Sequence, residues 1–86
     1  MATIAVSDTQ TVGERLATAR KLAGIDQTTM GHLIGASRPT VSAWERDERE
    51  PSFSQVVRWA KETGQSLEWL AGGVWVRHEG FEPPTF

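Results

Sequence analysis

The chain has 86 residues and carries a formal net charge of −2 at pH 7, with no cysteine. This length fits one small domain, near the size at which folding buries only about 60% of the unfolded surface, and the missing cysteines exclude disulfides and thiolate metal sites. The sequence shows neither a long apolar run nor a basic leader followed by an apolar stretch, so we expect a cytoplasmic protein with no membrane partner.

The first helix is predicted to follow an N-terminal arm, residues 1–10, which lacks helical periodicity. Thr11 and Glu14 form the pattern of a capping box, in which each side chain bonds the backbone of the other residue. Gly24 ends the helix. The apolar positions on its inner face are Val12, Leu16, Ala19 and Ala23.

Residues 27–46 predict two short helices joined by one tight turn. Asp26 suits the N-cap of the first of these helices, 27–34, because its carboxylate accepts from free N–H groups and favours the positive end of the helix dipole. Gly35 ends that helix, at a position where a residue without Cβ adopts the left-handed conformation freely. Gly31 falls where the two helices are expected to cross, so a larger side chain would hold them apart.

The second helix of the pair, 38–45, begins at Ser37, whose hydroxyl suits an N-cap. Pro39 is tolerated in its first turn because no intrahelical donor is needed there. The facing apolar stripes of the two helices are Met30, Leu33 and Ile34 on one and Val41 and Trp44 on the other. The second helix then exposes Arg38, Pro39, Thr40, Ser42 and Ala43. This arrangement is a helix-turn-helix, and such a face can read DNA.

After an acidic, solvated loop at 46–50, a further helix is predicted over about 52–62, and Ser66 caps a short last helix. The residues expected inward on the 52–62 helix are Phe53, Val56, Val57 and Ala60. Gly64 ends this helix.

Residues 73–86 form a C-terminal extension in which Val74 and Val76 alternate with Trp75, a pattern that predicts a short strand. Two interpretations stay open. The extension is a strand or arm that pairs with a second copy or docks on a partner, or it is an extended tail that covers the domain's own core. Exposed aromatic side chains on so small a domain mark a contact of either kind.

In the order and spacing of these segments, the chain resembles the phage repressor and Cro type of helix-turn-helix domain, also called the XRE family. The matching landmarks are the run from Arg20 to Gly24, Asp26-Gln27, Trp44-Glu45, Pro51-Ser52, and Leu67 to Leu70 with Gly72. The resemblance covers 11–72. It implies an all-α, lambda-repressor-like bundle of about five short helices, to which the extension could add a short terminal β-strand.

The resemblance also suggests roles for residues at the motif. Gln27 matches a family position whose side chain and backbone amide hold a phosphate; otherwise it is a solvated helix start. Arg38 could pair with a guanine, the alternatives being a phosphate contact or a solvated arginine. The expected base contacts are Arg38, Pro39, Thr40, Ser42 and Ala43, and the expected phosphate contacts are Gln27, Ser37, Arg15 and Arg46. The family often has longer amides at the positions of Pro39 and Ala43.

Charge and core positions complete the site. Residues 11–46 hold five basic and three acidic side chains, whereas residues 47–86 hold four basic and seven acidic ones, so the positive potential lies with the motif. Arg20 and Glu45 match family positions that form an ion pair between helices, and we expect them to be structural. Trp44 and Trp69 are expected in the core, and a lone His32 makes no metal site.

No catalytic constellation, metal site, cofactor motif or small-molecule ligand is evident, which argues against an enzyme. Two classes of binder remain. One is a regulator, of the repressor or Cro kind, that binds a palindromic double-stranded DNA operator as a homodimer. The other is the antitoxin of a toxin–antitoxin pair, which masks a toxin and regulates its own operator. A toxin-masking protein usually carries a long extension, and only thirteen residues follow Gly73, so we favour the regulator.

Overall fold

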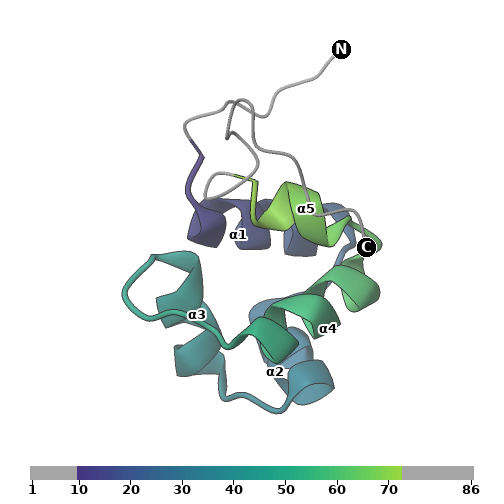
Figure 1. Ribbon diagram of the computed structural model, residues 1–86. Helices are drawn as coiled ribbons and strands as arrows, with labels where there is room; N and C mark the ends of the chain where they lie inside the picture. The colour runs from purple at the N-terminus through teal and green to yellow at the C-terminus, as the bar shows by residue number, and fades with distance from the viewer. Residues whose placement is uncertain (1–9, 73–86) are drawn as a thin grey trace, which may run out of the picture.

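The computed structural model describes residues 10–72, in which five helices enclose one core (Figure 1). The helices are α1 (Val12–Leu22), α2 (Gln27–Ile34), α3 (Arg38–Glu45), α4 (Phe53–Thr63) and α5 (Leu67–Leu70). The all-α, five-helix prediction is confirmed, and residues 10–72 contain no strand. The arm up to residue 9 and the strand expected at 74–76 lie outside the described residues.

A capping side chain lies at the start of each of the five helices. At α1, Glu14 N donates to Thr11 Oγ1 at 3.1 Å and Thr11 N donates to Glu14 Oε1 at 2.9 Å, which completes the expected capping box. Ser52 and Gln55 form a second capping box at the start of α4. The sequence therefore marks the helix boundaries through local hydrogen bonds that need no distant partner.

The core receives a fully buried side chain from every helix. These five side chains are Leu16, Met30, Val41, Trp59 and Leu70. Trp59 occupies the centre, where its indole Nε1 donates to the Leu16 carbonyl at 3.1 Å and its ring meets Trp44 edge to face, with the ring centroids 6.3 Å apart. Trp44 is thus a core residue as expected, and α3 is fixed to α4 through this aromatic pair.

Three predicted core positions differ in the structure. Ala23, expected on the inner face of the first helix, is exposed because it lies past the last turn of α1, at the C-cap. Phe53, expected inward, is 73% exposed because it is the first residue of α4 and lies beyond the edge of the core. Trp69 is only partly buried and packs against the core from outside. The helical period predicts which face of α4 is apolar. It does not predict that the core leaves the first turn of that helix exposed.

Gly31 is buried between α2 and the turn that follows it. A Cβ atom there would overlap the carbonyl oxygen of Ala36, far inside the 3.0 Å that real Cβ atoms keep. The close contact is therefore with the turn, rather than with the crossing helix as the sequence suggested. Because Gly31 has no side chain, the turn that follows α2 packs directly against this helix. The close contact sets the direction in which α3 leaves the turn.

Candidate nucleic-acid interface

The outer face of α3 carries the side chains expected to read DNA. Arg38 and Pro39 are exposed, and Thr40 and Ser42 are partly buried. Ala43, which was expected on the same face, is only 9% exposed. Ala43 therefore offers a base far less surface than the sequence suggested.

A hydroxyl pair closes the N-terminal end of α3. Thr40 N donates to Ser37 Oγ at 3.2 Å, which makes Ser37 the N-cap, and Ser37 Oγ donates to Thr40 Oγ1 at 3.0 Å. The hydroxyl of Ser37 is thus occupied in both directions. A phosphate contact by this side chain would have to replace one of these bonds.

At the other end of α3, Arg46 is held by two neighbours. Its Nε and Nη2 atoms donate to the two oxygens of Glu48 at 3.0 and 2.9 Å, and its Nη1 donates to Ser42 Oγ. The hydrogen bond to Glu48 raises the pKa of Arg46 and lowers the pKa of Glu48. Both side chains are 56% exposed, so solvent weakens the pairing.

The N-terminus of α2 opens into a hollow of about 420 Å³ beside α3. The hollow is lined by Arg20, Asp26, Gln27, Thr28 and Arg38. Asp26 caps α2 by accepting from Thr29 N at 2.7 Å, and this backbone hydrogen bond is the main reason that the pKa of Asp26 is lowered. Arg38 and the N–H groups at the start of α2 suit this surface to an anion, while Arg20 is paired with Glu45 and the Asp26 carboxylate also lines the hollow.

Behind the hollow, Arg20 and Glu45 form a two-point ion pair between α1 and α3. Arg20 Nε lies 2.6 Å from Glu45 Oε2, and Arg20 Nη2 lies 3.0 Å from Glu45 Oε1. Arg20 also donates to the Ile25 carbonyl at 2.9 Å. Gln27 Nε2 donates to the same Glu45 Oε1 at 3.0 Å, so the side chain expected to hold a phosphate is tied to this pair.

Arg15, predicted from the sequence to contact a phosphate, is largely buried inside the fold. Its side chain is buried, with 6% of the residue exposed, and the guanidinium stacks over the Trp69 ring at 5.2 Å from the centroid. Arg15 also donates to the carbonyls of Trp69 and Gln10, at 3.1 and 3.4 Å. Its contacts join α1 to the end of α5 and leave little of the side chain exposed for the phosphate contact predicted from the sequence.

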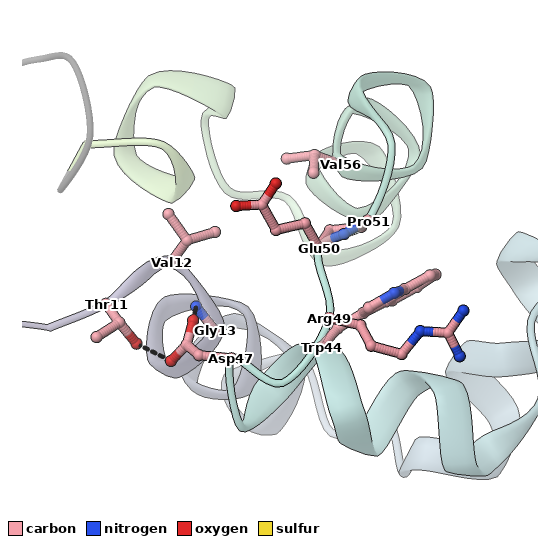
Figure 2. Close-up of a pocket in the computed structure, with 9 residues that line it drawn as sticks. All are labelled: Thr11, Val12, Gly13, Trp44, Asp47, Arg49, Glu50, Pro51 and Val56. Atoms are coloured by element: carbon pink, nitrogen blue, oxygen red, sulfur yellow. Dashed lines mark hydrogen bonds between the residues drawn. The ribbon is translucent and has the colours of Figure 1, made fainter.

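Asp47, which the sequence analysis did not single out, ties the loop after α3 to the start of α1 (Figure 2). Asp47 Oδ2 accepts from Thr11 Oγ1 at 2.5 Å, and Oδ1 accepts from Gly13 N at 3.0 Å. The backbone of Asp47 has a φ of 60°, in the left-handed region that aspartate tolerates better than most residues. Nothing in the local sequence indicates a partner more than thirty residues away, so this contact could not be foreseen.

Within residues 10–72, no cluster of histidine and carboxylate side chains is arranged to hold a metal ion. None of the helices in the same range combines the length and hydropathy needed to cross a bilayer.

Comparison with known proteins agrees with this geometry. A helix-turn-helix family model matches residues 16–70. The repressor protein C2 of Salmonella phage P22 is 35% identical over 66 residues, which are 77% of this chain and 31% of that protein. The chain thus spans less than a third of the relative's length.

Solved structures give the same result. A crystal structure of the P22 c2 repressor in complex with a synthetic operator matches with a TM-score of 0.69 at 35% identity, covering 76% of this chain and 98% of that one. The restriction-modification controller protein C.AhdI from Aeromonas hydrophila matches with a TM-score of 0.63 at 29% identity, covering 69% of this chain and 89% of that one.

Proposed function

The chain belongs to the helix-turn-helix family, a repressor-type DNA-binding family and not an enzyme family, and we propose that it regulates transcription by binding a specific operator. The operator is palindromic double-stranded DNA, and two copies of the chain bind it through the major groove. Residues 11–72 form the DNA-binding domain in this proposal. The supporting observation is the exposed face of α3 beside the hollow at the start of α2.

The hollow sets how the domain lies on the duplex. A backbone phosphate placed at the N-terminus of α2 receives N–H groups of the helix and the positive charge of Arg38. Gln27 Nε2 has two protons, and only one is used by Glu45, so the second is free to reach the phosphate. With the phosphate held there, the neighbouring α3 enters the major groove with Arg38 leading.

The remaining roles follow from exposure. Arg38, Pro39, Thr40 and Ser42 face the bases, whereas Ser37 and Arg46 lie at the two ends of α3, where the strands of the groove pass. Arg46 reaches a phosphate only in competition with Glu48. The P22 c2 repressor, which shares 35% identity and this fold, was solved on a synthetic operator, and this supports the same mode of binding here.

The proposed dimer follows from the small number of bases that one helix reads. A single α3 specifies a few base pairs, which is too little to find one site in a genome. Two copies placed about 34 Å apart, one helical turn of DNA, double the contacts and make a palindrome natural. The candidates for pairing across the dyad are Val74, Trp75 and Val76, outside the described residues.

Selection of bound sequences from a random pool of double-stranded DNA tests the proposal. The full chain should enrich a two-fold symmetric sequence, because two identical domains read it in opposite directions. The matched control is the double variant Gln27→Ala with Arg38→Ala, which should enrich no sequence. Because Gln27 also bonds Glu45, a thermal melt checks that this variant is folded. Failure of the parent chain to enrich any sequence would contradict a DNA-binding function.

A further inference from the structure

We propose that the loop between α3 and α4, residues 46–50, and the exposed Phe53 that follows it form a contact between two copies of the chain on an operator. The partner is a second copy of this chain, and the contact is made by its DNA-binding domain. This inference rests on the proposed function and gives it an interface that is separate from the segment 74–76.

Most charges of the loop are already paired within the domain. Arg46 and Glu48 bind each other through two hydrogen bonds, of 3.0 and 2.9 Å. The carboxylate of Asp47 accepts from the hydroxyl of Thr11 and from the backbone N–H of Gly13. These bonds hold the loop at the end of α3 and leave its last two charges for another partner.

Those two charges are Arg49 and Glu50. Both side chains are exposed, and neither takes part in the ion pairs found within residues 10–72. Figure 2 shows the two side chains pointing away from each other, although they are neighbours in the sequence. Neighbouring charges of opposite sign are self-complementary across a two-fold axis, because Arg49 of each copy meets Glu50 of the other and the pairing is made twice.

Phe53 supplies an apolar surface beside these charges. It is 73% exposed, and within residues 10–72 only Leu22, the last residue of α1, is an equally exposed large apolar side chain. Phe53 follows Glu50 by three residues and begins α4, so its ring lies at the same end of the domain as the loop. Two such rings that meet at a dyad bury each other, with the paired charges around them.

The position of the loop on α3 brings it to the dyad. It leaves the C-terminal end of α3, about 12 Å from the first turn, where Arg38 lines the hollow proposed to hold a phosphate. In Figure 1 the loop forms the edge of the domain to the left of α3. The two copies of α3 in a two-fold complex run in opposite directions. With the phosphate contacts on the outer flanks of the operator, both loops therefore face its centre.

The contact is small. Two rings and two ion pairs bury far less than the area of about 1,000 Å² that a stable interface needs. This face therefore does not hold two copies together in free solution. It acts when DNA places them side by side, where each copy meets the other at a high effective concentration. The contact then appears as cooperative binding to a palindrome.

Charge reversal in the full chain tests this contact. The DNA is the palindrome selected by the parent chain, compared with the same DNA after one half-site has been scrambled. Arg49→Glu or Glu50→Arg alone replaces two attractive pairs at the dyad with two repulsive ones. The ratio of the affinities for the palindrome and the half-site should fall about tenfold in each variant. Using the ratio removes the general effect of a changed charge on DNA binding.

Restoring the complementarity should restore the ratio. The double variant Arg49→Glu with Glu50→Arg exchanges the two charges in each copy and should behave as the parent does. An equimolar mixture of the two single variants is the sharper control. A mixed pair places two acidic side chains opposite two basic ones, so the mixture should bind the palindrome more tightly than either variant alone. A defect in folding or in phosphate contact would show no such recovery.

Phe53→Ser should lower the same ratio about threefold, whereas Leu22→Ser, at an equally exposed position, should leave it unchanged. If Arg49→Glu weakens binding to both DNAs equally and the mixture shows no recovery, Arg49 binds a phosphate and the inference is wrong. Unchanged ratios in every variant would also exclude the loop as an interface. In both cases the selected operator still supports the proposed function. If the parent chain selects no operator, the function and the inference fail together.

Discussion

Arg20 and Glu45 join α1 to α3 through two parallel hydrogen bonds of 2.6 and 3.0 Å, with only 10% and 7% of their side chains exposed. The carboxylate that holds Arg20 also holds Gln27, at the start of α2. The buried carboxylate of Glu45 thus links α3 to both α1 and α2. The proposed phosphate contact, Gln27, lies on α2.

Replacing one member of this pair should cost much more than replacing both. Arg20→Met or Glu45→Leu alone leaves a buried charge without its partner, with an expected loss of about 3 kcal/mol in the free energy of unfolding. The double variant should lose less than the sum of the single losses. Denaturant melts of the four proteins measure this coupling, and additive losses would show that the two side chains do not interact.

Arg38 and Gln27 should fail in different ways on DNA. Arg38→Ala should weaken binding and relax the preference at one base pair per half-site, since it removes a base contact. Gln27→Ala should weaken binding to all sequences about equally, since a phosphate carries no sequence information. Affinities for substituted operators separate the two effects. A uniform loss for Arg38→Ala would disprove its role as a base reader.

Gly31→Ala should destabilise the fold although alanine favours helices. The gain in helix propensity is about 1 kcal/mol, whereas forcing a Cβ into the Ala36 carbonyl requires a backbone shift that costs about 1–3 kcal/mol. The matched control is His32→Ala at the next, exposed position of α2, which should change stability by less than about 0.5 kcal/mol. Thermal melts of the two variants and the parent measure these changes. A Gly31→Ala variant more stable than the parent would show that the turn at Ala36 can shift to accept a Cβ atom.

Asp26 should make the fold sensitive to acid. Its pKa is lowered below the ordinary value of 3.8, chiefly by the hydrogen bond from Thr29 N, so its charged form stabilises the folded chain above that value. This contribution is lost as the pH falls through the lowered pKa. Asp26→Asn keeps a capping side chain without the charge. Melting temperatures between about pH 2 and 6 should fall more steeply for the parent than for the variant. Parallel curves would exclude Asp26 as a source of acid sensitivity.

A chain truncated after Gly73 should stay folded, because every buried core side chain within residues 10–72 comes from α1 to α5. If the segment 74–76 pairs across the dyad, the truncated chain should bind a full palindrome much more weakly and keep its affinity for a half-site. Equally tight and cooperative binding by both chains would exclude the segment as the dimer element. The next candidate would then be α5 around Trp69.

The sequence predicted the helices well because their ends are local. Caps such as Asp26 and Ser37 bond backbone groups three residues away. Gly35 adopts a left-handed conformation at the C-cap of α2, which needs no distant partner. The boundaries of α2 and α3 are the predicted ones.

Contacts between distant residues were less predictable. The burial of Arg15 depends on Trp69, 54 positions away, and the role of Asp47 depends on Thr11, 36 positions away. Trp59 bonds the carbonyl of Leu16, 43 positions away, and meets the ring of Trp44 only in the folded chain. In the site, the sequence indicated which side chains α3 exposes. It did not indicate that the hydroxyls of Thr40 and Ser42 accept hydrogen bonds from Ser37 and Arg46.

The division of α3 into an inner and an outer face separates two kinds of constraint on the sequence. Val41 and Trp44 are buried and hold the helix in place, while Arg38 and Pro39 are exposed. A substitution at an exposed position disturbs no buried contact and needs no compensating change elsewhere. Such a scaffold can acquire a new target by a few mutations while its folding stays intact, and it can be retargeted by design in the same way.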